Sequence, residues 1–372
     1  MLPYTGDYIE HIEPGKNSLK FYSFTPRPLM RGNIYQMDDE LAMLLIDAHR
    51  NIGFLEGLIK YAPNKEAFAE LMLLKECTYS RMIDYDNPDF KEVLTSRGTA
   101  KGNISPIIDL EAAYRAALNM EICAPDLSRI CGIALYGESE DNPMSVRDHQ
   151  TFWLGAKTNL KGYNPTAPDA VLPALADISA YLYNDQKTDP LIKAALVHYQ
   201  FEMIHPFERY NGIVGRIIVP MMLSDIAREA KLLICLSEYL YHNKNEYFDL
   251  LRSTQYSGGY IRWIKFFVNA VGEVAKKSAK LMTQYERIIA LDEHRLTEIG
   301  KSTKSIFEIY NYLKDTPITT ITVAERNLGF SFNTVSKLFH SLQGYGIVEC
   351  HLPSYRNRVF RYSELENLIC AD

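Results

Sequence analysis

The chain has 372 residues, 47% hydrophobic and 23% charged, a composition typical of a globular protein that excludes a disordered or collagen-like chain. Its formal net charge of −6 excludes a generally basic nucleic-acid coat but leaves a local basic patch open. Its six cysteines form no CxxC pair, which excludes a zinc ribbon and disfavours a disulfide framework. No apolar run is long enough to cross a membrane and the N-terminus shows no export signal, so we expect a cytoplasmic protein with no membrane partner.

Helical periodicity dominates the chain before residue 300. From Asp38, which we place near an N-cap, apolar residues recur at three- and four-residue steps and predict a helix over 38–59. A second helix is predicted over 65–83, before the break at Asp86-Asn87-Pro88. Residues 137–169 lack this period and are expected to form a long surface loop, a kind of loop that often carries function. Further helices are predicted at 107–121, 126–136, 171–184, 190–204, 212–230, 244–255, 260–290 and 292–298.

The sequence changes character after Gly300 and predicts a separate small domain. Short helical patterns are followed there by β-branched and aromatic runs, with a turn at Gly329. Three helices and then two strands are the pattern of a winged helix-turn-helix. The helices are predicted at 302–314, 323–327 and 332–343, and the strands at 347–351 and 358–362.

The segment from Ile204 to Arg216 is the strongest candidate for chemistry. A long helix is predicted to end at His205-Pro206, and a new helix begins near Gly212 after a polar loop. Free N–H groups at such a helix start, together with the helix macrodipole, favour an anion such as a phosphate. We expect His205 and Arg216 to face one anion-sized pocket there. The alternative is an ordinary connection between two helices with a satisfied histidine.

Residues 205–216, HPFERYNGIVGR, resemble the signature HxFx(D/E)GNGRxxR of Fic proteins, which transfer AMP from ATP onto hydroxyl side chains of target proteins. The flanks support the resemblance, because RDHQTFWLG at 147–155 is similar to the segment that precedes the family's flap, and residues 22–84 and 236–267 are similar to its other helices. The resemblance implies a mostly α-helical fold with a small β-hairpin flap. The matching fixed positions are His205, Phe207, Asn211, Gly212 and Arg216.

The resemblance also implies roles for these residues. In the family the histidine is the general base that takes a proton from the target hydroxyl as its oxygen attacks the α-phosphate, and His205 matches it. Arg216 matches the arginine that faces the outer phosphates, and ATP is the implied substrate. The implied nucleotide-binding residues are Asn211, Gly212, Gly215, Arg216 and Arg209, the last on the rim of the pocket.

Three departures from the signature concern the chemistry. Arg209 stands where the family has an acidic ligand for Mg²⁺, so we expect a divalent metal to be repelled and assign no metal ligand. Loss of metal assistance could slow transfer by about a thousandfold or more, although the guanidinium of Arg209 could itself bind phosphate. Tyr210 replaces a glycine, which predicts a different loop shape, and Ile213 replaces an arginine.

Two further segments resemble regulatory and target-binding parts of the family. Ser80 and Asp84 match an inhibitory motif, (S/T)xxxE(G/N), whose Glu pairs with the second arginine. Because Asp is one methylene shorter than Glu, we expect its contact with Arg216 to be long, loose or water-bridged. Residues 157–164 correspond to the flap, which receives an extended segment of the target protein by strand addition, and Tyr163 is the residue predicted to pack on it.

The resemblance predicts an N-terminal helical region with the inhibitory helix (1–105) and a Fic core with its following helices (106–299). The pattern of helices and strands after Gly300 predicts the winged helix (300–372). This last region holds seven Lys or Arg against six acidic residues, with Lys337 on the predicted recognition helix. DNA, a protein partner and a homodimer therefore stay open for it. The wing carries Arg356, Arg358 and Arg361.

Two functions follow from this sequence. The first is an enzyme that transfers AMP, or another phosphate-containing group, with His205. The second is a non-catalytic regulator that binds a nucleotide or DNA and uses the winged helix.

Overall fold

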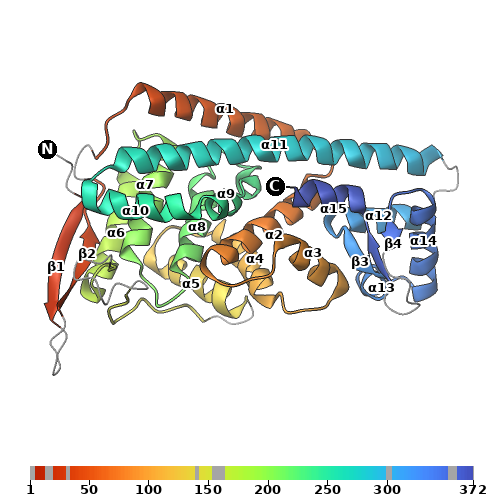
Figure 1. Cartoon of the computed structure of the whole chain (residues 1–372), viewed down its shortest axis with the longest axis horizontal. Coiled ribbons are helices and arrows are strands. Elements are labelled where there is room, and N and C mark those ends of the chain that lie inside the picture. Colours follow the sequence, from red (N-terminus) through yellow and green to blue (C-terminus); the bar gives the residue numbers. More distant parts are fainter. Residues whose placement is uncertain are drawn as a thin grey trace.

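The long helix α11 (Tyr260–Glu298) runs along most of the molecule, and the other elements pack on its sides (Figure 1). The computed structural model describes residues 5–12, 20–30, 34–138, 142–152, 164–298, 304–350 and 358–371. Within these ranges the chain is mostly α-helical, as predicted, with two small antiparallel sheets. No helix in these ranges is long and apolar enough to cross a bilayer.

Helix α1 (Asp39–Tyr61) lies along the first part of α11, at the outer edge of the molecule (Figure 1). Its start is set by Asp38, whose carboxylate accepts a hydrogen bond from the N–H of Leu41. One apolar stripe of α1 is buried, which confirms the helix predicted over 38–59. The buried residues are Leu41, Leu45, Ala48, Ile52, Leu55 and Ile59.

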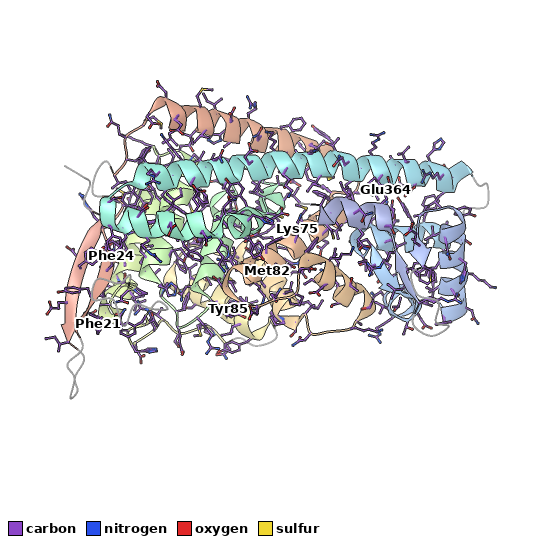
Figure 2. All side chains as sticks on the ribbon, in the orientation of Figure 1. Phe21, Phe24, Lys75, Met82, Tyr85 and Glu364 are labelled. Atoms are coloured by element: carbon purple, nitrogen blue, oxygen red, sulfur yellow. The ribbon has the colours of Figure 1, made fainter. Side chains whose placement is uncertain are left out.

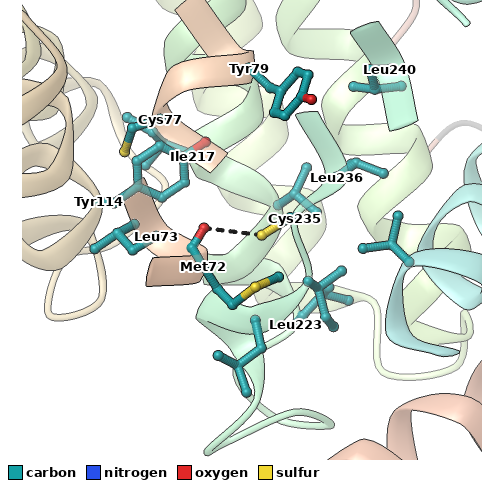
Figure 3. Close-up of a cluster of buried hydrophobic side chains, with 14 of the residues drawn as sticks. Met72, Leu73, Cys77, Tyr79, Tyr114, Ile217, Leu223, Cys235, Leu236 and Leu240 are labelled. Atoms are coloured by element: carbon teal, nitrogen blue, oxygen red, sulfur yellow. Dashed lines mark hydrogen bonds between the residues drawn. The ribbon is translucent and has the colours of Figure 1, made fainter. Parts of the chain in front are cut away.

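Helix α2 (Lys65–Asp84) lies at the centre of the fold. Its neighbours are α4 (Ser105–Ala117), α8 (Asn211–Met222) and α9 (Leu236–His242). Met72 and Leu73 of α2 meet Tyr114 of α4 and Leu236 of α9 in one buried cluster, where the Cys235 thiol donates to the Met72 carbonyl at 3.1 Å (Figure 3). This packing places the end of α2 beside the start of α8.

The other helices before α11 agree with most of the predicted ranges. α7 begins after Asp189, which caps it through the N–H of Leu191, and Pro190 takes its first position, where no intrahelical donor is needed. These helices are α3 (Phe90–Thr99), α5 (Ala124–Tyr136), α6 (Pro168–Asn184), α7 (Pro190–Ile204), the short 3-10 helix η2 (Lys231–Leu233) and α10 (Lys244–Ser257).

A hairpin of β1 (Gly6–Ile12) and β2 (Lys20–Pro26) lies at one end of the molecule, where Figure 2 shows Phe21 and Phe24. The strands were not predicted, because β1 is exposed on both faces and therefore lacks an alternating apolar pattern. The other edge of β2 meets the chain just after residue 163, since the Phe24 N–H donates to the Asn164 carbonyl at 3.1 Å. Of the predicted flap, 157–164, residues 157–163 with Tyr163 lie outside the described residues.

The C-terminal part contains the predicted order of three helices and then two strands. A third strand, β3, joins them in an antiparallel sheet of order β3-β5-β4, and a last helix, α15, follows. The winged-helix assignment and the domain boundaries stay predictions. The elements are α12 (Lys304–Asp315), β3 (Ile318–Thr320), α13 (Ile321–Leu328), α14 (Phe332–Gly344), β4 (Glu349–Cys350), β5 (Val359–Arg361) and α15 (Ser363–Cys370).

This C-terminal part packs directly on the N-terminal helices. Gly98 of α3 lies so close to β3 that a methyl group there would be 1.5 Å from the Ile318 carbonyl oxygen. Lys314 is buried and donates to Glu293 at 2.6 Å and to Asn64, before α2, at 2.8 Å. The beginning of α2 is thereby tied to α11 and α12.

Two predicted helix boundaries were wrong. The helix expected over 212–230 ends at Met222, where the Ser224 hydroxyl donates to the Pro220 carbonyl and takes an acceptor of the last turn. The two helices expected at 260–290 and 292–298 are one helix, because Asp292 is buried and bonded to Tyr362 and Arg295 instead of interrupting it. Helices α3, α9 and α15 were not predicted.

Candidate active site

The loop between α7 and α8 is closed by Asn211. Its side-chain oxygen accepts from the N–H of Phe207 and its side-chain nitrogen donates to the Phe207 carbonyl, both at 2.8 Å. Phe207 is fully buried and anchors the loop in the core. Because both polar ends of Asn211 are used within the loop, its place in the signature is explained by loop shape.

His205 ends α7 in the left-handed conformation, with φ 51°, and its ring interacts with the backbone of Glu202. Burial and the nearby charge of Arg147 lower the pKa of His205 to about 4, while the charge of Asp84 opposes the shift. The imidazole is therefore neutral near pH 7, the form that can accept a proton from a hydroxyl.

Arg147 holds the backbone around His205 from the other side. Its side chain is buried and donates to four backbone carbonyls. The carbonyl of His205 accepts at 2.8 Å, and those of Ile204 and His149 each accept at 3.1 Å. The fourth acceptor is the carbonyl of Thr166. The first two carbonyls belong to the end of α7, where helical acceptors have no intrahelical donor. Arg147 therefore connects the end of α7 to the chain just after residue 163. It lay in the segment compared with the family, but its clamp role was not predicted.

Arg216 of α8 is bound to α2. Its Nε donates to the Ser80 hydroxyl at 2.8 Å, and its Nη2 donates to the Ser80 carbonyl at 2.8 Å and to Asp84 at 2.5 Å. Burial alone would lower the pKa of Arg216, but the charge of Asp84 raises it. The predicted meeting of Ser80, Asp84 and Arg216 is thus present in the structure.

The expectation of a long or water-bridged contact for Asp84 was wrong. Asp84 is the last residue of α2, and Gly212 opposite it has no side chain, so a methyl group there would lie 2.9 Å from the Asp84 carboxylate. The carboxylate therefore comes close to the first turn of α8. The close approach of α2 to α8 makes up for the missing methylene.

The two predicted glycines have different surroundings. Gly212 faces the carboxylate of Asp84 at the helix start, whereas Gly215 packs on α7. A methyl group at Gly215 would lie 2.2 Å from a carboxyl oxygen of Glu202. The backbone carbonyl of Gly215 lies 2.9 Å from the buried ring of His198. Gly215 is therefore required by close helix packing, while its predicted contact with a nucleotide stays a prediction.

The three departures from the signature take separate places. The side chain of Arg209 is exposed, and Ile213 is fully buried in the core. Tyr210 adopts the left-handed conformation that favours glycine, with φ 67°. Its hydroxyl accepts from Arg81 of α2 at 2.6 Å, and its ring lies 5.5 Å from that of Tyr85. This contact with α2 offsets the cost of the backbone conformation.

The donor set does not fit a divalent metal held as in the resembling family. Arg209 is a cation, and Asp84 is already paired with Arg216. Glu202 is buried, and burial raises its pKa to about 8, which keeps it uncharged at pH 7. In the described part of the chain, no group of three or more His, Cys, Asp or Glu side chains is placed to hold a metal ion.

Glu202 and His198 are buried titratable residues that the sequence did not single out, because each lies inside an apolar helix with no distinguishing pattern. The ring of His198 is 2.9 Å from both the Gly215 carbonyl and the Tyr247 hydroxyl. It joins α7 to α8 and α10.

We expect His198 to make folding sensitive to acid. Burial lowers its pKa from 6.5 to about 4, so below pH 6.5 the unfolded chain binds a proton that the folded chain does not. The free energy of unfolding of wild type, measured relative to that of His198→Gln, should therefore fall by up to about 3 kcal/mol as the pH falls from 6.5 to 4. Denaturant unfolding of both proteins over a pH series measures this difference, and a constant difference would contradict the prediction.

The predicted basic residues of the C-terminal part are dispersed. Arg361 pairs with Glu366 at 2.8 Å, and Arg358 lies 3.2 Å from the ring of His340 on α14. Lys337 is exposed on α14, and Arg356 lies outside the described residues. Lys337 on α14 and Arg358 directly before β5 stay residues predicted for DNA binding that the structure describes here.

Comparison with known proteins shows what the residues around this site are similar to. The model of the Fic/DOC family matches residues 124–223. Protein adenylyltransferase fic-1 of Caenorhabditis briggsae is 38% identical over 64 residues, 16% of this chain and 12% of that protein. Probable protein adenylyltransferase aq_aa38 of Aquifex aeolicus (strain VF5) is 28% identical over 113 residues, 30% of this chain and 31% of that protein. The chain thus covers less than a third of either relative.

A solved structure supports the fold. A Fic family protein from Desulfovibrio desulfuricans G20 superimposes with a TM-score of 0.56 at 14% identity, over 89% of this chain and 98% of that chain. The agreement extends beyond the residues matched by the family model. Residues 124–223, which the Fic/DOC family model matches, contain the loop of His205 and the first turns of α8.

Proposed function

We propose that this chain is a protein adenylyltransferase that is held in a restrained state by α2. The observation that carries the proposal is the carboxylate of Asp84, which lies beside Gly212 at the start of α8 and accepts from Arg216 at 2.5 Å. A helix start with a buried arginine is a site for an anion, and here an anion of the chain itself is bound. An outer phosphate of ATP would take this place when Asp84 leaves.

The transfer uses His205 as the base. The hydroxyl oxygen of a target side chain attacks the α-phosphorus of ATP and forms a new P–O bond, the bond to the β-phosphate oxygen breaks, and pyrophosphate leaves. His205 takes the proton of the hydroxyl, for which its neutral imidazole is suited. The relatives named protein adenylyltransferases support ATP as the substrate. The target protein is proposed to enter along the flap at 157–164.

Arg209 changes the metal dependence of this reaction. Its exposed guanidinium can bind a phosphate oxygen directly, so ATP binding should be nearly independent of Mg²⁺. Arg209→Asp restores a carboxylate and should make binding depend on Mg²⁺. Calorimetric titration of ATP with and without Mg²⁺ measures both proteins, and a wild type that binds ATP only with Mg²⁺ would contradict the prediction.

Transfer itself is tested with ATP that is labelled in the α-phosphate. Three proteins are compared: wild type, the single variant Asp84→Ala, and the double variant that carries both Asp84→Ala and His205→Ala. We expect label on protein with Asp84→Ala, less with wild type, and a loss of about a hundredfold or more when His205 is also replaced. Label that survives His205→Ala would contradict the assigned base.

The alternative is a regulator that binds nucleotide without transferring it. It is favoured by the burial of Ile213 and the exposed cation of Arg209, which leave the site without a family arginine and a family carboxylate. ATP binding by Asp84→Ala with no labelled protein would support this alternative. Binding of a DNA duplex that is weakened by Lys337→Glu would add DNA as its partner.

A further inference from the structure

Helix α1 is apolar on its outer face as well as its inner face. A helix on the surface of a globular protein normally has polar residues on the side that faces solvent. Besides the ion pair of Arg50 and Asp47, four outward positions of α1, spaced by three, eight and seven residues, carry large apolar side chains that are more than half exposed. They are Met43 at 57%, Ile46 at 57%, Phe54 at 62% and Tyr61 at 79% exposed.

Two glycines form hollows on the same face. Gly53 and Gly57 have no atom within 4 Å of the position that a β-carbon would occupy, so no neighbour in the described chain requires them to be small. A glycine inside a helix costs about 1 kcal/mol relative to alanine. The outer face of α1 thus combines exposed bulky side chains with open hollows.

We infer that this face binds the same face of a second copy of the chain, with the two α1 helices antiparallel. A twofold axis near residue 52 places Ile46 of each copy opposite the hollow at Gly57 of the other. It also brings Met43 to Tyr61, a thioether to an aromatic ring. A twofold interface must be complementary to itself, and this face supplies both members of each pair.

Charge complementarity supports the antiparallel arrangement. The exposed face of α1 is acidic at its beginning, where Asp39 is exposed and Glu40 already pairs with Lys265 of the same chain, and basic at its end, with Lys60. Antiparallel packing brings these ends together, whereas parallel packing places like charges side by side. The same arrangement brings Arg50, which pairs with Asp47 of its own helix at 2.7 Å, opposite the ring of Phe54, where a cation–π contact would add to the interface.

The dimer leaves the site of His205 and Arg216 free. In Figure 1, α1 lies at the outer edge, on the other side of α11 from α2 and α8. Disruption of this interface should therefore change the oligomeric state without removing the site.

The first test compares oligomeric state by light scattering over a range of protein concentrations. Wild type should be a dimer, and Phe54→Glu should weaken association by about thirtyfold or more, because it places a charge in the centre of the face. The control is Tyr183→Glu on α6, a change at a tyrosine that is 83% exposed and does not belong to α1, which should stay dimeric. Circular dichroism confirms that each variant is folded. A wild type that is monomeric throughout, or a dimer that survives Phe54→Glu, overturns the inference.

The second test measures the geometry by cysteine cross-linking. Gly53→Cys lies near the axis and should form a disulfide with itself. In a mixture, Met43→Cys should cross-link to Tyr61→Cys, and wild type with its native cysteines should not cross-link. A Met43→Cys variant that instead pairs with itself would show a parallel arrangement and overturn the antiparallel dimer.

Discussion

Replacing Asp84 with alanine should raise the affinity of the chain for ATP by about tenfold or more. An outer phosphate must displace the carboxylate before it can reach Arg216, and a hydrogen bond to a charged group is worth about 1.5–3 kcal/mol. The contact is direct, at 2.5 Å, and the arginine is almost completely buried, so solvent screens it little. Calorimetric titration of ATP measures the change.

Matched variants separate the charge of Asp84 from its shape. Asp84→Asn keeps the shape and removes the charge, so its affinity should lie between those of wild type and Asp84→Ala. Asp86→Ala removes a neighbouring exposed carboxylate and should leave affinity unchanged. Ser80→Ala should have a smaller effect than Asp84→Ala, because the Ser80 carbonyl continues to accept from Arg216. An unchanged affinity of Asp84→Ala would mean that Asp84 does not compete with ATP.

Replacing Arg147 with methionine should lower the free energy of unfolding by about 3–5 kcal/mol. The buried guanidinium donates to four backbone carbonyls, and methionine fills part of the space but donates to none of them. Each buried carbonyl that loses its donor costs about 1–3 kcal/mol, and entry of water lowers the total. Denaturant unfolding measures the difference.

The control for Arg147 is Arg129→Met, a change at an exposed arginine of α5 that should alter stability by less than about 0.5 kcal/mol. Arg147→Lys should behave almost like methionine, because an ammonium group cannot reach carbonyls on several sides at once. Any Arg147→Met protein that remains folded should also lose transfer activity, since the His205 carbonyl is one of the four acceptors. Normal stability with normal activity would contradict the clamp.

The secondary structure shows which elements can be predicted from local sequence pattern and which cannot. The helix predicted over 38–59 and that over 65–83 agree with α1 and α2 to within two residues, because apolar periodicity is a property of consecutive residues, to which Asp38 adds a cap in α1. The hairpin of β1 and β2 was not predicted, since β1 is mostly exposed on both faces and so lacks an alternating apolar pattern. The end of α8 at Met222 depends on a local bond of Ser224 that competes with the helix.

In the candidate site, too, some features were found from the sequence and others required the structure. The resemblance of residues 205–216 to a family signature identified His205, Asn211 and Arg216, and the order of residues alone was enough for that. Ser80 and Asp84 were also found from the sequence, but the length of the aspartate side chain led to the wrong expectation of a loose contact. The distance depends on how closely α2 approaches α8, which a side chain by itself does not reveal.

By itself, therefore, the sequence determined the helical class, most helix positions and the residues that surround the start of α8. Only the tertiary structure decided that Asp84 binds Arg216 directly, that Arg147 clamps the end of α7 and that α1 has an exposed apolar face. The physical reason is that periodicity and motif spacing arise from neighbouring residues, whereas burial, desolvation and contact distance arise from segments that are separate in the chain and meet only when it folds.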